Sequence, residues 1–411
     1  MALTYQQIWE RYSQFEFQRR IFVKRLFEDG TYEATYTEIP RNIVRNSSVS
    51  SLKRSLPNSS WQFGKVLVNN VRLNILSPFQ EFASEANSNS LFAGFVRDKS
   101  IVKVEDAVID KYTDPETPTE VTVTTFEGLI DAKTATTEEG FETLTVLDFI
   151  SILASINVKD LTLTATTLNA LVYEIMNRVE FTKFFTVSNS STYIDAGYNA
   201  TMIDTSVYDS TVIAMLTDLA KGHSIFYIDP DDNTFYFKEV TATPTVQYSF
   251  LERSNKKLSI KKYREGVDRQ ITHWYWEDTD ISSIASPLPV NPIPKNFKID
   301  GITDATQRQN TLDFVLTKTD IAKPYFSLAL PYFPIIKLLD RVVVQSFGQA
   351  PPDTARWGMF AWTSTGTTNP SEAPRWHKPA GIRISSDREW IVRGISHSAN
   401  LTTTLEVEQL S

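Results

Sequence analysis

The stretch SSDREWIVRGISHSANLTTTLEVEQLS, residues 385–411, indicates a β-rich fold. Apolar and polar residues alternate over 390–395, a polar turn follows, and a Thr-rich run covers 401–409. Alternation with a period of two is typical of strands that have one buried face. We therefore expect an antiparallel hairpin in this part of the chain.

A second hairpin is expected near the other end, in FEFQRRIFVKRLFEDGTYEATYTEI, residues 15–39. Strands over 20–27 and 32–39 would be joined by a turn at Glu28-Asp29-Gly30, because Asp-Gly is a strong signal for a tight β-turn. Two hairpins so far apart, with no catalytic motif between them, indicate a protein that assembles with other proteins.

Length and composition limit the class of protein. A chain of 411 residues is longer than one hydrophobic core usually serves, so we expect two or three domains. Its 41% hydrophobic and 22% charged residues are ordinary for a globular protein, and no apolar run is long enough for a transmembrane helix. Cysteine is absent, which excludes disulfides, thiolate metal ligands and a cysteine nucleophile.

The negative charge is concentrated in the middle of the chain. Residues 91–240 contain 24 Asp and Glu against 10 Lys and Arg, whereas both flanking stretches are slightly basic. A surface that binds nucleic acid is usually basic, so general affinity for nucleic acid is not expected. An acidic wall would let DNA slide past without sticking, with the stretch 98–142 as its candidate position, although a simple solvated face explains the same charges.

Periodicity predicts a β-rich α+β protein with two β-barrel-like domains and a small α+β insert. The N-terminal β-barrel domain would cover 1–156, the α+β insert 157–240, and the C-terminal β-barrel domain 241–411. A helix is expected over 143–156 at the end of the first domain. The prolines of 286–297 are expected to break any regular element in the third.

The insert is predicted as helices followed by a hairpin. One helix would cover 164–179. Four apolar residues at helical spacing would face the core: Leu168, Leu171, Val172 and Ile175. A second helix over 210–221 would close at Gly222, since glycine commonly ends helices. Strands over 224–228 and 234–240 would then flank a polar turn.

A long segment rich in Gly, Pro, Ser and Thr lies between the last two predicted strand regions of the third domain. It carries Trp357, Trp362 and Trp376. Long segments without periodicity are usually functional or mobile, so an assembly interface is a candidate place for these three indoles. Packing against their own domain is the alternative.

Motifs for catalysis and cofactor binding are missing from the sequence. The nucleophile-elbow, zinc-protease and phosphate-loop patterns do not occur, and the four histidines have no metal-ligand spacing. Asp229, Asp231 and Asp232 lie together in DPDDN, which a polar hairpin turn explains. We therefore expect no enzyme activity, no cofactor and no metal, while a pair of carboxylates with hydrolase geometry stays open because sequence does not give distances.

The order of these elements resembles the baseplate or tail hub proteins of tailed bacteriophages and related contractile injection systems. The resemblance is carried by the opening hairpin and by a C-terminal signature of Trp, Val, Gly and His followed by a Thr-rich strand with Leu. The signature residues are Trp390, Val392, Gly394, His397 and Leu405, with a structural role.

The resemblance implies a structural virion protein, assembled in the host cytoplasm and located in the tail or baseplate. Such hubs form a homotrimeric ring whose duplicated barrels present pseudo-sixfold symmetry. Partners would be a tail-tube or distal-tail protein, a tape-measure protein and a spike or fibre protein, with genome DNA passing through the channel. A receptor- or glycan-binding tail-tip protein is the alternative function, and a peptidoglycan hydrolase is a third.

Overall fold

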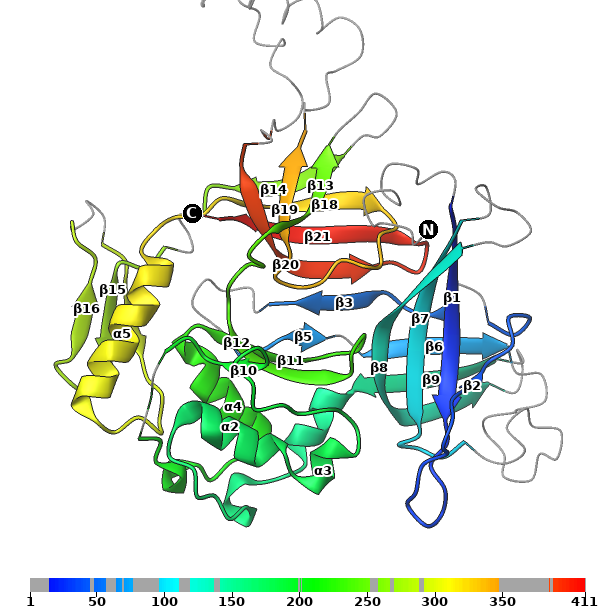
Figure 1. Cartoon of the computed structure of the whole chain (residues 1–411), viewed down its shortest axis with the longest axis horizontal. Coiled ribbons are helices and arrows are strands. Elements are labelled where there is room, and N and C mark those ends of the chain that lie inside the picture. The colour runs from blue at the N-terminus through cyan, green and yellow to red at the C-terminus, as the bar shows by residue number, and fades with distance from the viewer. Residues whose placement is uncertain are drawn as a thin grey trace, which may run out of the picture.

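The computed structural model is β-rich, with strands in four sheets and a few short helices (Figure 1). It describes residues 15–44, 48–56, 64–68, 70–76, 96–110, 119–136, 141–198, 200, 202–251, 258–266, 270–287, 292–346, 384 and 387–410. Within these ranges, no helix combines the length and apolar character needed to cross a membrane. The predicted β-rich α+β fold class is confirmed.

The first sheet is formed by the N-terminal part of the chain. Its six strands lie in the order β2-β1-β7-β8-β9-β6 and pair antiparallel, and the sheet curves like part of a barrel (Figure 1). The bounds are β1 Phe15–Lys24, β2 Thr37–Glu38, β6 Val71–Leu76, β7 Ile101–Asp110, β8 Thr119–Thr136 and β9 Phe141–Asp148. One face packs an aliphatic core: in β6, for example, Val71, Leu73 and Ile75 are buried and alternate with exposed residues.

The opening hairpin is present in this sheet. β1 pairs with β2, and the isolated bridge between Leu26 and Tyr32 closes the turn, where Gly30 has a positive φ of 81°. Glycine adopts this backbone without the steric cost that a Cβ brings. The return strand is only two residues long, much shorter than the predicted 32–39.

The helix predicted over 143–156 is wrong in its first half. Residues up to Asp148 belong to β9, and only Phe149–Ala154 form a 3-10 helix, η3. Leu144 and Val146 are buried and alternate with the half-exposed Thr143 and Thr145, which is the pattern of a strand. Pairing with β6 and β8 on both sides overrode the helical spacing.

The α+β part contains helices α2 (Leu168–Met176), α3 (Val179–Thr182) and α4 (Val212–Leu219). The four residues predicted to face the core in the first helix are all buried. The predicted hairpin is β11 (Ser224–Asp229) and β12 (Thr234–Glu239), in a sheet of order β10-β12-β11-β4. The two small outer strands are β10 (Ile194–Asp195) and β4 (Gly64–Lys65).

Gly222 does not end the second helix in the way the sequence suggested. The residue with the left-handed backbone is His223, at φ 80°, after a final 3-10 turn η6 (Ala220–Gly222). A Cβ on Gly222 would lie 2.4 Å from the Tyr198 ring. The glycine is therefore needed for close packing against Tyr198 and not for a left-handed cap.

Residues 270–319 form a unit of which the sequence predicted only one strand, over 269–278. A three-stranded sheet of order β16-β15-β17 lies against helix α5, Ala305–Thr319 (Figure 1). Its strands are β15 His273–Trp276, β16 Ser282–Ile284 and β17 Pro294–Phe297. The prediction that prolines break any regular element over 286–297 is therefore wrong for its last four residues, which form β17. This unit shares one hydrophobic core with α2 and α4. The predicted domain boundary at 240 would separate residues that pack in this core, and the division into three domains stays a prediction.

The C-terminal sheet has the order β13-β19-β20-β21-β18-β14. Its strands are β13 Val246–Leu251, β14 Ser259–Arg264, β18 Tyr325–Pro331, β19 Arg341–Gln345, β20 Glu389–His397 and β21 Thr402–Gln409. The hairpin predicted from the C-terminal stretch is β20–β21, with strand bounds close to the predicted ones.

One segment, residues 48–76, contributes strands to three different sheets; we call it the shared segment. Its β3 (Leu52–Ser55) pairs with β20 of the C-terminal sheet, and its β4 pairs with β11 of the α+β part. Its last strand, β6, belongs to the N-terminal sheet, and the short β5 (Leu67–Val68) pairs with β3. Figure 1 shows β3 lying beside β20 although the two are far apart in sequence.

Candidate functional site

Three of the signature residues form the core of the β20–β21 hairpin. Trp390, Val392 and Leu405 are fully buried in the hydrophobic cluster of the C-terminal sheet. The Trp390 ring stands edge-on to Phe326, with 4.6 Å between ring centroids. Their structural role as a family signature stays a prediction.

Gly394 marks the place where the hairpin is irregular. Val392 pairs with Val407 and Gly394 with Glu406, so Arg393 is an extra residue, a β-bulge, in β20. On its other side Gly394 pairs with Ser55 of β3. A Cβ at Gly394 would lie 2.9 Å from a carboxylate oxygen of Glu406. The glycine thus lies where the shared segment joins the hairpin.

His397, the fourth position of the signature, lies beside a buried polar network. Arg19 of β1 donates from Nε to Asp106 Oδ1 of β7 at 2.8 Å and from Nη2 to Tyr332 Oη at 2.8 Å. Tyr332, in the segment after β18, donates its hydroxyl to Asp106. Its ring stands edge-on to His397 at 5.4 Å. The network therefore joins the N-terminal sheet to the C-terminal sheet.

Burial decides the protonation states in this network. The side chains of Arg19 and Asp106 have no exposed surface. Burial, followed by the charge of Asp106, raises the pKa of Tyr332 well above its usual value, so the hydroxyl stays protonated and donates. Burial lowers the pKa of His397 to about 4, so at neutral pH its ring is uncharged beside the Arg19 guanidinium. The buried pair is thus one cation with one anion.

The sequence contains a signal for this network, although the partners cannot be read from it. Arg19 lies in register with buried Ile21 and Val23 on β1, and Asp106 with buried Val104 and Val108 on β7. A charged residue at an apolar position of an alternating strand indicates a buried ion pair. The partner could not be identified, because Tyr332 is 313 residues from Arg19.

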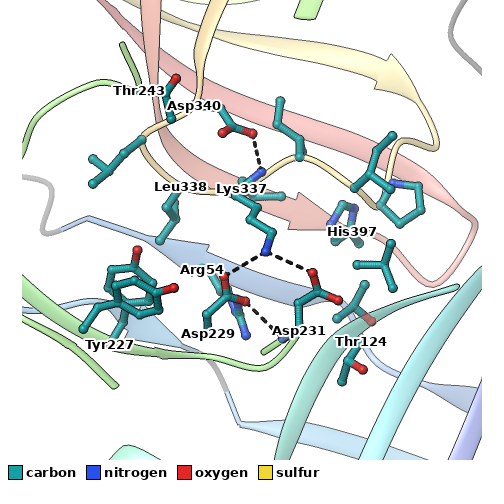
Figure 2. Close-up of a pocket in the computed structure, with 18 of the residues that line it drawn as sticks. Arg54, Thr124, Tyr227, Asp229, Asp231, Thr243, Lys337, Leu338, Asp340 and His397 are labelled. Carbon is teal, nitrogen blue, oxygen red and sulfur yellow. Dashed lines mark hydrogen bonds and ion pairs between the residues drawn. The ribbon is translucent and has the colours of Figure 1, made fainter. Parts of the chain in front are cut away.

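A cavity of about 310 Å³ lies next to this network, where elements of the N-terminal sheet, the α+β part and the C-terminal sheet meet (Figure 2). Its walls come from β3, β8, β11, β12 and β20 and from the segments 241–244 and 334–340. Lys337 extends into it, with Nζ 3.2 Å from Asp229 and 2.9 Å from Asp231. Two of the three aspartates of DPDDN therefore lie at this junction, and the turn they form is the one predicted.

Asp340 stabilises the loop that carries Lys337. The backbone N–H of Lys337 donates to Asp340 Oδ2 at 2.7 Å (Figure 2). The backbone N–H of Val392 donates to the Asp340 carbonyl at 2.9 Å. Burial raises the pKa of Asp340 to about 7. Nearby, the rings of Tyr227 and Tyr236 stack at 5.0 Å.

Two carboxylates that face this cavity from the hairpin, Asp229 and Asp231, are held by the Lys337 ammonium. A third, Asp340, accepts from the Lys337 backbone N–H. In the ranges that the structure describes, no group of three His, Asp or Glu residues could hold a metal ion. The ion pairs of Lys337 connect the β11–β12 hairpin to the 334–340 segment.

The other predicted sites have different outcomes. Trp357, Trp362 and Trp376 lie outside the described residues. In the acidic stretch 98–142, several carboxylates have partners within the chain, such as Glu120 with Arg20 at 2.6 Å and Asp131 with Lys99 at 3.1 Å. An acidic lumen in this stretch stays a prediction.

Comparison with known proteins finds similarity among solved structures only. No protein-family model matches the chain, and no curated protein is found to match its sequence. It is similar to a tail protein from Neisseria meningitidis MC58, at 10% identity over 96% of both chains with a TM-score of 0.49. It is also similar to the 43 kDa tail protein of prophage MuSo2 from Shewanella oneidensis, at 11% identity over 96% of this chain and 98% of that one, with a TM-score of 0.48. A third is prophage tail protein gp18 from Listeria monocytogenes EGD-e, at 9% identity over 95% and 94%, with a TM-score of 0.47.

Proposed function

We propose that this chain is a structural protein of a phage-type tail or baseplate, and that it acts as a hub. Three copies would form a ring that joins the tail tube to a central spike or fibre and surrounds the DNA channel. Its partners would be two more copies of itself, a tail-tube or distal-tail protein, a tape-measure protein and the spike or fibre protein.

The observation that supports this function most is the way the two large sheets are joined. A ring subunit with two strand-rich bodies must hold them at a fixed spacing if both are to dock on neighbouring rings. Here the buried network of Arg19, Asp106 and Tyr332 connects the sheets, and the shared segment adds a strand to each of them. Such a junction resists hinge motion, because bending it would expose a buried ion pair.

The cavity at the junction supports a role without catalysis. Asp229 and Asp231 are paired with the Lys337 ammonium, and Asp340 accepts from the Lys337 backbone N–H. The other walls are mostly aliphatic, aromatic or Thr side chains, together with Arg54, Lys238 and His397. A structural hub needs no reactive group, and the packing of this region is consistent with one. The proposal therefore includes no enzyme activity, no cofactor and no metal.

The test is the native mass of the purified full chain over a concentration series, with negative-stain images of the same samples. A trimer has three times 46.7 kDa, about 140 kDa, and a ring with a central hole is the expected particle. An elongated trimer without a channel would favour the receptor- or glycan-binding tail tip, which a glycan array would then test. A monomer at every concentration, also after addition of tail-tube rings, would overturn the hub.

A further inference from the structure

A second, smaller cavity lies on the other side of the junction and has a different charge character. It measures about 220 Å³ and lies between the end of α5, the segment after β12 and the β20–β21 hairpin. Three cationic side chains from three separate elements line it: Lys318, Lys323 and Arg393. Glu408 is the acidic residue among the lining residues.

Arg393 is placed in this cavity by the bulge in β20. Because it is the extra residue between the pairs Val392–Val407 and Gly394–Glu406, it departs from the regular alternation of the strand. Its Nη1 lies 2.8 Å from Glu408 Oε1, and both side chains are about nine-tenths buried, at 11% and 10% exposure. This pair is a fixed wall of the cavity.

Lys318 also has its own carboxylate, since its Nζ lies 2.6 Å from Glu239 Oε1. Lys323 differs from both of these cations. Its side chain is partly buried, and its ammonium group makes no ion pair or hydrogen bond with any residue that the structure describes. Burial lowers its pKa, and Arg393 and Lys318 add to this effect, while the carboxylates of Glu408 and Asp320 oppose it. Two cations of the cavity are therefore held in direct ion pairs, and Lys323 forms none with the described residues.

We propose that this cavity binds a small oxyanion, a phosphate or carboxylate group, held chiefly by Lys323 with Arg393 and Lys318 beside it. A partly buried cation without a direct ion-pair partner is less favourable than a paired one, and an anion in the cavity would supply that partner. Ammonium and guanidinium donors on several sides suit an oxyanion, which accepts charge-assisted hydrogen bonds in several directions. The volume accommodates such a group but not a large ligand. This inference does not depend on the proposed hub function.

The test is calorimetric titration of the full chain with inorganic phosphate and with acetate, against sodium chloride at matched ionic strength. The variants are Lys323→Met, which removes the charge but retains the aliphatic stem, and Lys323→Arg, which retains a cation. Lys261→Met is the matched control, because Lys261 is exposed on β14 and lines no part of the cavity. Thermal unfolding in chloride alone accompanies each titration.

We expect saturable binding of phosphate, acetate or both to the wild type, and at least about tenfold weaker binding to Lys323→Met. Lys323→Arg and Lys261→Met should bind as the wild type does. In chloride alone, Lys323→Met should unfold at the same or a higher temperature, because it removes a partly buried charge that has no direct ion-pair partner. The proposal is overturned if neither anion binds beyond the chloride control, or if Lys323→Met binds with unchanged affinity.

Discussion

Replacing Asp106 by Asn tests whether the buried network connects the two large sheets. The substitution conserves shape but removes the charge that faces the Arg19 guanidinium at 2.8 and 3.2 Å, where neither side chain has exposed surface. Removing one partner of a buried pair leaves an uncompensated charge, which typically costs about 3–5 kcal/mol. We expect a loss of unfolding free energy in this range.

Arg20, the residue next to Arg19 on β1, offers a matched control through its pair with Glu120. Arg20 forms a two-pronged pair with Glu120, at 2.6 and 2.8 Å, but the two side chains are 17% and 32% exposed. Glu120→Gln removes a charge from a pair of similar geometry, and exposed pairs contribute only about 0–1 kcal/mol. The difference in lost unfolding free energy between Asp106→Asn and Glu120→Gln therefore measures the effect of burying an ion pair, because the geometry of the two pairs is similar.

The assay is urea unfolding followed by tryptophan fluorescence, with the buried Trp390 as one reporter in the C-terminal sheet. A triple variant, Arg19→Met with Asp106→Leu and Tyr332→Phe, removes both charges and the hydroxyl together and should be less destabilised than Asp106→Asn alone. If Asp106→Asn loses no more stability than Glu120→Gln, the network does not connect the sheets in the way described here.

Three further predictions concern pH and packing. Burial lowers the pKa of His397 to about 4, so the unfolded chain binds a proton below about pH 6.5 that the folded chain does not. The contribution of His397 to stability should therefore fall by up to about 3 kcal/mol from pH 6.5 to 4; His397→Gln should lack this contribution, and urea midpoints that run parallel to those of the wild type would contradict it. Burial raises the pKa of Asp340 to about 7, so its contribution has the opposite sign: it is present below about pH 4 and is lost, by up to about 4 kcal/mol, as pH rises to 7. Asp340→Asn should lack this second contribution, and parallel profiles of variant and wild type would refute it; each contribution is the difference between variant and wild type, because the two oppose each other in the wild type. Leu405→Ala, at a fully buried position, should cost about 2–5 kcal/mol in urea unfolding, against under about 1 kcal/mol for Leu76→Ala at a 38% exposed position; equal losses would show that the hairpin core is not packed as described.

The sequence predicted elements whose periodicity is local. Both terminal hairpins, the first helix of the insert with its buried face, and the β11–β12 hairpin follow from alternation, helical spacing and turn residues. These signals extend over ten to twenty residues, so no distant contact is needed to read them.

Elements that depend on distant partners were missed. Residues 143–148 have spacing that fits a helix, but β6 and β8 pair with them on either side. Helix α5 has a weak apolar pattern, and its N-terminus is marked by Asp304, whose side chain accepts from Gln307 N at 2.9 Å. An Asp before a polar segment is only a weak signal for the start of a helix. The proline-rich passage upstream favoured irregular structure, so the helix was not predicted.

The candidate site was predicted only in part, for the same reason. The signature residues of β20 and β21 were named from the resemblance to tail hub proteins, which needs only the local sequence of one hairpin. Arg19, Asp106 and Tyr332 lie on three separate elements, and their contact depends on how the two sheets pack. Composition and spacing do not carry that information.

The shared segment also affects the order in which the protein folds. β3 is made early in synthesis, but the strand beside it, β20, lies more than 300 residues later in the chain. At 5–20 residues per second, ribosomes need on the order of tens of seconds to cover that distance. During this interval the edge of β3 has no β20 to pair with, and contacts of such long range form slowly. Any factor that delays this pairing, such as a slow codon run or a missing chaperone, would leave an exposed strand early in the chain and favour aggregation of the nascent protein.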